Sequence, residues 1–243
     1  MRVAEVWDTA TGSPDVYTAV IDTGIAREHE DLKDRVSLQY SRNCCGEAET
    51  YIDDKKGHGS HVAGTIAATG NNGKGVVGVN WNGGIIALKV FPDRGKGAAD
   101  SDIAKALDYL TKLLLKDPSL KVPAVNLSLG GYEPNRPDKN MGTPMWLAYK
   151  ALDKLDRTVI VVAAGNEGLE VGRPAPFTDY ARSVVQGHYV YPASYIGIDN
   201  LVVVGAMQSD DQGASFSNWS DTNVDISTRS EERRVGKECR SRW

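Results

Sequence analysis

The stretch Gly57-His58-Gly59-Ser60-His61-Val62-Ala63-Gly64, preceded by Asp53-Asp54, decides how the rest of the chain is interpreted. Small apolar residues continue after it through Ala68 and predict a helix that packs tightly against a sheet. The glycines on either side of His58 let the backbone come close to whatever the imidazole touches. We therefore expect His58 at a helix start, at the edge of a cleft.

Other roles for this histidine have to be weighed. His58 and His61 are three residues apart, a spacing that can present two metal ligands on one helix face. Zinc-protease helices use His-Glu-x-x-His with the glutamate as base, and this stretch has neither that spacing nor the glutamate. A structural or solvated histidine in a glycine-rich turn is the remaining alternative. A catalytic role requires a carboxylate partner.

The upstream chain offers such a carboxylate. Residues 16–21 form a compact, β-branched apolar run that predicts a buried strand, and this run ends in Asp22-Thr23-Gly24. An acid at the carboxyl end of a parallel strand lies where open α/β sheets place their sites. Aspartic proteases use the same tripeptide, but they are all-β proteins with a second acidic loop, and this chain has no second Asp-Thr-Gly.

Apolar runs and amphipathic segments alternate along the rest of the chain. Further strands are expected at 84–90, 122–129, 158–164, 201–206 and 224–227. Helices are expected from about 100 to 117, capped by Asp100 and Ser101, and from Pro144 to about 156, capped by Thr143. The apolar face of the first of these helices consists of Ile103, Ala106, Leu107, Leu110 and Leu114. Segments 132–142 and 169–190 are expected to be loops.

This alternation predicts an α/β fold: three layers, with a mostly parallel sheet and helices on both faces. The 243 residues, 41% hydrophobic and 25% charged, suit one soluble globular domain. No apolar run reaches the roughly 18 residues that a membrane span needs. No GxGxxG follows a strand and no Walker sequence occurs, so nucleotide binding has no support. Cys44 and Cys45 are adjacent in a polar loop, and they are either free or bonded to a partner elsewhere.

Residues 229–243, RSEERRVGKECRSRW, differ from what precedes them. They lack apolar periodicity and resemble one translated frame of a sequencing-library adapter over their whole length, with a solvated basic tail as the alternative. We therefore divide the chain into a natural part, 1–228, and a non-native tail, 229–243. The tail's positive charge does not indicate a nucleic-acid site, and no nucleic-acid or membrane partner is expected.

The natural part resembles the catalytic domain of a subtilisin-like serine protease over about residues 3–228. The motifs that carry the resemblance occur in family order: Ile21-Asp22-Thr23-Gly24-Ile25, Gly57 to Gly64, Asn126-Leu127-Ser128-Leu129-Gly130-Gly131 and Ala164-Gly165-Asn166-Glu167-Gly168. Ser60 stands where the family commonly has threonine. The resemblance implies a serine endopeptidase that is secreted, acts on polypeptides and is a monomer when intact.

The resemblance also assigns catalytic roles. Asp22 is the acid of the triad, His58 is the general base, and Asn166 is the asparagine of the oxyanion hole. A free imidazole titrates near about 6.5, so it can accept and return a proton near neutral pH. A buried carboxylate on its other nitrogen fixes the tautomer and stabilises the imidazolium. For Asn166 the alternative is an ordinary turn residue.

Substrate and calcium sites are carried over in the same way. Gly95-Lys96-Gly97 and Ser128-Leu129-Gly130 match the two segments that clamp an extended substrate, although Leu129 could equally be core. Ala163-Ala164-Gly165 match the wall of the first specificity pocket. Loop 70–76 matches the main calcium loop, with ligands from Asp31, Gly70, Asn72, Lys74 and Val76; a plain glycine–asparagine turn is the alternative. Tyr191-Pro192 matches a bond that is cis in the family.

The chain departs from the family at the nucleophile. The Gly-Thr-Ser-Met-Ala run expected after residues 224–227 does not occur in the 243 residues. The candidate serines in this region all lack a following small-residue helix: Ser217, Ser220, Ser227, Ser230 and Ser241. We therefore expect a domain incomplete at its C-terminus and an inactive fragment of an active parent. The alternative function is a non-catalytic, protease-like binding domain that keeps the cleft.

Overall fold

The computed structural model describes residues 3–46, 48–95, 97–178 and 184–229. Its elements in chain order are α1 (Val3–Trp7), β1 (Val16–Asp22), β2 (Arg42–Asn43), α2 (His58–Ala67), β3 (Gly84–Lys89), α3 (Asp100–Lys116), β4 (Lys121–Leu127), β5 (Gly131–Glu133), α4 (Pro137–Asn140), α5 (Pro144–Asp153), β6 (Val159–Ala163), β7 (Ala175–Thr178), β8 (Val184–Tyr191), β9 (Leu201–Met207) and β10 (Ile226–Arg229).

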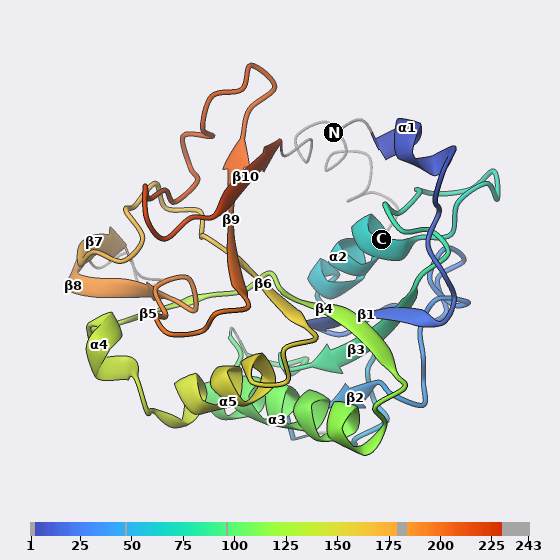
Figure 1. Cartoon of the computed structure of the whole chain (residues 1–243), viewed down its shortest axis with the longest axis horizontal. Helices are drawn as coiled ribbons and strands as arrows, with labels where there is room; N and C mark the ends of the chain where they lie inside the picture. Colours follow the sequence, from blue (N-terminus) through green and yellow to red (C-terminus); the bar gives the residue numbers. More distant parts are fainter. Residues whose placement is uncertain (1–2, 47, 96, 179–183, 230–243) are drawn as a thin grey trace.

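The main sheet confirms the predicted α/β fold. Its order is β10-β9-β6-β4-β1-β3-β2, and every strand pair in it is parallel. Helices α3 and α5 pack together below the sheet, and α2 lies on the opposite face beside β1 and β3 (Figure 1). Parallel strands bury both faces only when helices cover both. The three layers are therefore present where α2 lies over the sheet.

The α3–α5 side of the sheet holds the larger hydrophobic core. Five buried apolar residues of α3 face it, as the sequence predicts: Ile103, Ala106, Leu107, Leu110 and Leu114. The predicted cap of α5 is also confirmed, because the Thr143 hydroxyl accepts a hydrogen bond from the Trp146 N–H at 3.3 Å. These two helices bury matching apolar faces, which explains why their periodicity was a reliable guide.

The predicted cap of α3 is wrong. The N-cap position is Ala99, which provides no side-chain hydrogen bond, and Asp100 lies already in the first turn. A carboxylate in the first turn still favours the helix because it faces the positive end of the helix dipole. The acidic residue therefore identified the first turn of α3 correctly, but it does not occupy the N-cap position.

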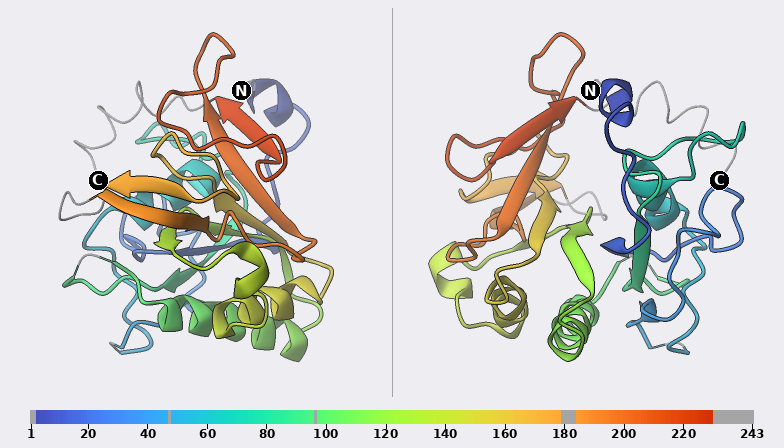
Figure 2. Two further views of the ribbon diagram at one scale, coloured as in Figure 1. Left: turned by 90° about the vertical axis from the view of Figure 1, so that its left-hand side faces the viewer. Right: turned by 45° about the vertical axis from the view of Figure 1, so that its right-hand side comes forward.

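The two segments expected to be loops contain regular structure. Segment 132–142 takes part in β5 and contains α4, and segment 169–190 contains β7 and most of β8. These strands form a small antiparallel sheet in the order β5-β8-β7, set apart from α2 (Figure 2). The β5–β8 pairing joins residues far apart in the chain, which local pattern could not reveal, whereas β7 and β8 are neighbours in the chain and pair antiparallel. The Tyr191–Pro192 bond is cis, as expected.

The end of the natural part also differs slightly. Strand β10 runs to Arg229, which pairs with Met207 of β9, so the residue that opens the expected tail continues a strand. Residues 230–243 lie outside the described residues.

The upper face of the sheet is covered unevenly. One cross-strand row on this face runs from Val20 through Asn126 and Val161 to Val202. Val20 is 3% exposed beneath α2, whereas the other members of the row are half-buried. Figure 2 shows β9 and β10 on one side of the molecule and α2 on the other. The strands from β4 to β9 thus present an incompletely covered apolar face.

Candidate active site

Asp22 and His58 meet at the carboxyl edge of the sheet. Asp22 ends β1, its side chain is 1% exposed, and its Oδ1 accepts a hydrogen bond from the Thr23 N–H at 2.6 Å. His58 Nδ1 lies 2.8 Å from Asp22 Oδ1 and 2.9 Å from Oδ2. With a carboxylate on Nδ1, the proton of a neutral imidazole belongs on that nitrogen. Nε2 is then the acceptor.

The start of α2 places the imidazole. His58 is the first residue of the helix, as predicted, and its side chain is 55% exposed. Gly57 before it has φ +84°, a left-handed conformation that favours glycine. A Cβ on Gly59 would lie 2.3 Å from the Gly24 carbonyl oxygen. The two glycines therefore allow α2 to approach the turn that carries Asp22.

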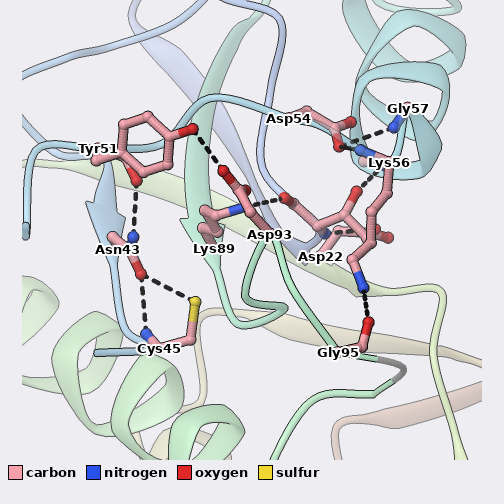
Figure 3. Close-up of polar contacts among 12 residues, drawn as sticks. Asp22, Asn43, Cys45, Tyr51, Asp54, Lys56, Gly57, Lys89, Asp93 and Gly95 are labelled. Carbon is pink, nitrogen blue, oxygen red and sulfur yellow. Dashed lines mark hydrogen bonds and ion pairs between the residues drawn. The ribbon is translucent and has the colours of Figure 1, made fainter. Parts of the chain in front are cut away.

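Two polar residues tie this helix start to its surroundings. Thr23 Oγ1 accepts from the Gly59 N–H at 2.8 Å. Asp54 accepts hydrogen bonds from the N–H groups of Lys56 and Gly57 at 2.9 and 2.8 Å (Figure 3). It also accepts from the N–H and the hydroxyl of Ser60 at 2.9 and 2.8 Å. Burial pushes the pKa of Asp54 upward, but the bonds from Ser60, Gly57 and Lys56 outweigh it and hold the pKa below its ordinary value. The ionised carboxylate thus fixes the loop before His58.

Asn166 lies at the same edge, after β6. In the sheet, β4 separates β6 from β1, so two strand spacings, about 10 Å, separate the ends of β1 and β6. Asn166 is exposed, and its backbone N–H donates to Glu167 Oε2 at 2.8 Å. Asn166 thus lies at the edge that carries Asp22 and His58, and among the residues that the structure describes its side chain makes no hydrogen bond.

The turn around Asn166 is held by Asn218, a residue that sequence reasoning missed. Asn218 is 1% exposed, and its Oδ1 accepts from the N–H groups of Glu167 at 3.1 Å and Leu169 at 2.8 Å. Its Nδ2 donates to the Ala164 carbonyl at 2.8 Å. Only its position in the polar run between Ser217 and Trp219 could have drawn attention to it. Through these hydrogen bonds Asn218 holds the backbone at Ala164, within the proposed pocket wall 163–165.

The two proposed substrate segments lie in the loops that follow β3 and β4. Gly95 belongs to the loop after β3, and its carbonyl accepts from Lys56 Nζ at 2.7 Å (Figure 3). Lys96 lies outside the described residues, and Gly97 lies just before α3. Ser128 Oγ accepts from Asn126 Nδ2 at 2.9 Å, and Leu129 packs partly buried against the main core. Gly130 follows, and a Cβ there would lie 3.0 Å from the Tyr191 carbonyl oxygen.

Loop 69–77 surrounds the Asp31 carboxylate and lines a recess of about 440 Å³. Asp31 is completely buried, and it accepts from Asn72 Nδ2 at 2.8 Å and from the Val76 N–H at 2.9 Å. Asn72 Oδ1 accepts from the Lys74 N–H at 3.0 Å. Gly70 packs so closely on Trp81 that a Cβ would overlap its ring. Across the described residues no group of three or more His, Cys, Asp or Glu could hold a metal.

The cysteines and the remaining serines are placed outside this centre. Cys44 is a buried thiol, and burial raises its pKa to about 11, whereas the half-buried Cys45 donates its Sγ–H to Asn43 Oδ1 at 3.1 Å. Ser217 is buried and donates to the Asn218 carbonyl, while Ser220 accepts from the N–H groups of Thr222 and Asn223. Ser227 lies on β10. Ser217 and Ser220 thus hold local structure.

Comparison with known proteins agrees with this arrangement. A sequence model described as the subtilase family matches residues 13–240, which extends beyond residue 228. The chain is 34% identical to Subtilisin DY of Bacillus licheniformis over 83% of its own length and 60% of that protein. It is 33% identical to an intracellular serine protease of Paenibacillus polymyxa over 93% of its length and 59% of that protein. The chain thus spans less than two thirds of these relatives.

A solved structure gives the same result for the fold. A protease of Pseudoalteromonas arctica matches 93% of this chain and 66% of its own chain with a TM-score of 0.71 at 25% identity. Between residues 3 and 229, with the gaps noted above, no helix has the length and apolar character needed to cross a bilayer.

Proposed function

The chain belongs to the subtilase family, and on that basis we propose that its parent protein is a serine endopeptidase that hydrolyses peptide bonds with an Asp/His/Ser triad. The observation that carries the proposal is the contact of His58 Nδ1 with the buried Asp22 carboxylate at 2.8 and 2.9 Å. In that arrangement Nε2 accepts the proton of the attacking serine and later returns it to the leaving amine.

Asp22 and Asn166 complete the proposed chemistry. Asp22 holds the imidazole in one tautomer and stabilises the imidazolium that forms when the serine proton is taken. Asn166, at the end of β6, would donate its side-chain N–H to the oxygen that becomes negative in the tetrahedral intermediate. Such a donor stabilises the transition state only when the negative charge develops on the substrate oxygen. The exposed side chain of Asn166 at the edge of the sheet is compatible with this role.

The incompletely covered face supports the idea that the serine comes from a further helix. Val161, Val202 and Ala163 are half-buried on central parallel strands, where both faces are normally covered. A helix packed there would approach the carboxyl edge from the side opposite α3 and α5. We propose that this helix carries the serine and that residues 1–228 form the incomplete peptidase domain.

The substrates follow from the same reasoning. Gly95–Gly97 and Ser128–Gly130 would pair with an extended polypeptide, and Ala163–Gly165 would line a pocket for one large side chain. A binding domain without catalysis would gain little from a buried carboxylate aligned on an imidazole nitrogen, so the catalytic function is preferred. We further propose a secreted protein that is monomeric when intact, although the relatives include both extracellular and intracellular proteases.

The loop around Asp31 fits a calcium ion in its chemistry. The Asp31 carboxylate is completely buried, and within the described residues it has no lysine or arginine partner, so a cation would offset its charge. Asn72 and the carbonyl groups of Gly70, Lys74 and Val76 would add hard oxygen ligands, provided that Asn72 presents its oxygen. Bound calcium would hold the loop against β1 and α2 and stabilise the fold.

The test uses the full-length parent protein and a fluorophosphonate probe, which labels only an activated serine. We expect labelling, hydrolysis of an unfolded protein substrate, and loss of both by several orders of magnitude in His58→Ala. His61→Ala is the matched control, because it changes the other histidine of the same helix and should leave labelling intact. Labelling that is absent, or that survives His58→Ala, would reject the proposal.

A further inference from the structure

Lys89 is a completely buried lysine next to the proposed catalytic acid. It is the last residue of β3, it pairs with Asp22 in the parallel register, and its side chain is 0% exposed. Lysine is almost never fully buried unless it is paired, because removing an ammonium group from water is expensive. A lysine at this position therefore needs partners, and the identity of those partners indicates its role.

The ammonium group bridges two segments of the site. Lys89 Nζ donates to the Thr23 carbonyl at 2.7 Å and to Asp93 Oδ1 at 3.0 Å (Figure 3). It also lies 6.0 Å from the centre of the Tyr51 ring, within reach of a weak cation–π attraction. Charge-assisted bonds in a buried site are stronger and shorter than neutral ones, so both segments are held firmly.

Thr23, on one side of the bridge, controls both members of the catalytic pair. Its N–H donates to Asp22 Oδ1 at 2.6 Å, and its Oγ1 accepts from the Gly59 N–H at the start of α2. A Cβ on Gly59 would overlap the Gly24 carbonyl, so the turn and the helix have little free space between them. Fixing the Thr23 carbonyl therefore fixes the carboxylate and the helix that carries His58.

Asp93, the other partner of Lys89, lies in the loop after β3, two residues before Gly95 of the proposed substrate segment. Tyr51 Oη donates to Asp93 Oδ2 at 2.6 Å, and this bond first, with the bond from Lys89, holds the pKa of Asp93 below its ordinary value. Gly95 is held again from the catalytic side, because Lys56 Nζ donates to its carbonyl at 2.7 Å. The substrate segment and the helix start are thus joined at two points.

We propose that Lys89 is a positioning residue that sets the Asp22–His58 pair relative to Asp93 and Gly95 in the loop after β3. Without the ammonium, the Thr23 carbonyl loses its donor and the Asp93 carboxylate loses its cation. Of the two connections, only the bond from Lys56 to Gly95 then still joins the two segments. The inference deepens the proposed peptidase function, since position relative to a bound polypeptide matters only for an enzyme that cleaves it.

The test observes the resting 243-residue chain by NMR, so it does not depend on turnover. Its readouts are the exchange rate of the His58 Nδ1 proton with water and the amide signal of Gly95. In Lys89→Met we expect exchange about tenfold faster or more, the scale of one lost hydrogen bond, together with a shifted Gly95 signal. Lys112→Met is the matched control: it removes an exposed i,i+4 partner of Asp108 and should change neither readout.

Two outcomes would overturn the proposal. The first is a folded Lys89→Met chain whose His58 Nδ1 exchange and Gly95 signal match those of the unchanged chain, which would make Lys89 a stabilising residue only. If Lys89→Met does not fold, Asp93→Asn decides, because it removes the anion and keeps the side-chain volume. We expect a shifted Gly95 signal and faster Nδ1 exchange there too, and unchanged values would reject the inference.

Discussion

Strands β3 and β9 belong to one parallel sheet, and yet they are packed very differently. All six residues of β3 are buried, whereas β9 buries only Val203 and Gly205 and leaves its other five residues half-buried. We call β1, β2, β3 and α2 the covered half, and β6, β9 and β10 the open half. Helices α3 and α5 lie on the lower face, so the difference arises on the upper face (Figure 1).

This contrast separates two requirements of the proposed enzyme. The acid–base pair lies in the covered half and is fixed by contacts within it, from Thr23, Asp54 and Lys89. The proposed oxyanion and pocket residues lie in the open half, where Asn218 orders the backbone and the side chain of Asn166 is exposed. The geometry of the Asp22–His58 pair therefore does not depend on whether the upper face of the open half is covered.

The largest effect is expected for a substitution at Gly59, where α2 packs closely against the Gly24 carbonyl. In Gly59→Ala the new Cβ would lie 2.3 Å from the Gly24 carbonyl oxygen, so the backbone has to move. We expect a loss of about 3 kcal/mol in the free energy of unfolding, measured with urea, and loss of the His58–Asp22 contact by NMR. Gly213→Ala is the control in the open half, since a Cβ there meets nothing within 4 Å. Equal losses in both variants would contradict the comparison.

Calcium should strengthen the covered half selectively. At about 100-fold its dissociation constant, the ion would add about 2.7 kcal/mol to the free energy of unfolding. We expect a higher Tm in calcium than in EGTA, with added hydrogen-exchange protection in loop 69–77 and α2. Asp31→Asn should abolish the shift, whereas Asp34→Asn, an exposed neighbour, should keep it. An identical Tm in calcium and EGTA would remove calcium from the proposal.

Two valine-to-alanine substitutions on one cross-strand row test how well the upper face of the sheet is packed in each half. Val20 and Val161 lie on the same cross-strand row, but Val20 is 3% exposed and Val161 is half-buried. We expect Val20→Ala to lower the free energy of unfolding by about 2 kcal/mol and Val161→Ala by less than about half of that. Similar losses would show that the face over β6 is as well packed as the face under α2.

The smallest expected effect is the pH dependence carried by Asp54. Because the folded-state pKa of Asp54 is lowered, its ionised form stabilises the fold at pH values above about 3.9, and this contribution is lost as pH falls through the lowered pKa. Asp54→Asn should therefore flatten the loss of stability at acid pH and weaken the start of α2. The control Asp34→Asn should leave the acid limb unchanged. Urea unfolding between pH 2 and 7 gives both curves.

Much of the fold follows from local pattern. Strands such as 16–22 and 201–207 carry compact apolar runs rich in β-branched residues, and α3 and α5 carry apolar faces at helical spacing. These patterns identified the elements, and the alternation of strand and helix indicated the parallel sheet. Strands β7 and β8 were missed although they pair with each other as neighbours in the chain, because β7 has only four residues and contains Pro176, which gives a weak strand pattern. The cap of α3 was misplaced because an acid in the first turn and an acid at the cap look alike in a sequence.

The catalytic pair could be anticipated because each member is anchored to a strong local signal. Asp22 directly follows a buried strand, and His58 stands between glycines at the start of a small-residue helix. The residues that hold the pair in place gave no such signal. Lys89 lay inside the strand expected at 84–90, and Asn218 lay in a short polar run near the end of the natural part.

The sequence by itself determined the parallel order of strand and helix and the acid and imidazole that meet at one edge. Only the tertiary structure decided which polar groups fix them, because the bonds from Lys89 to Thr23 and from Asn218 to Ala164 join positions more than fifty residues apart. Such bonds depend on where whole elements pack, and no periodicity encodes them. The uneven coverage of the upper face has the same origin, since it is a property of packed layers rather than of any single segment.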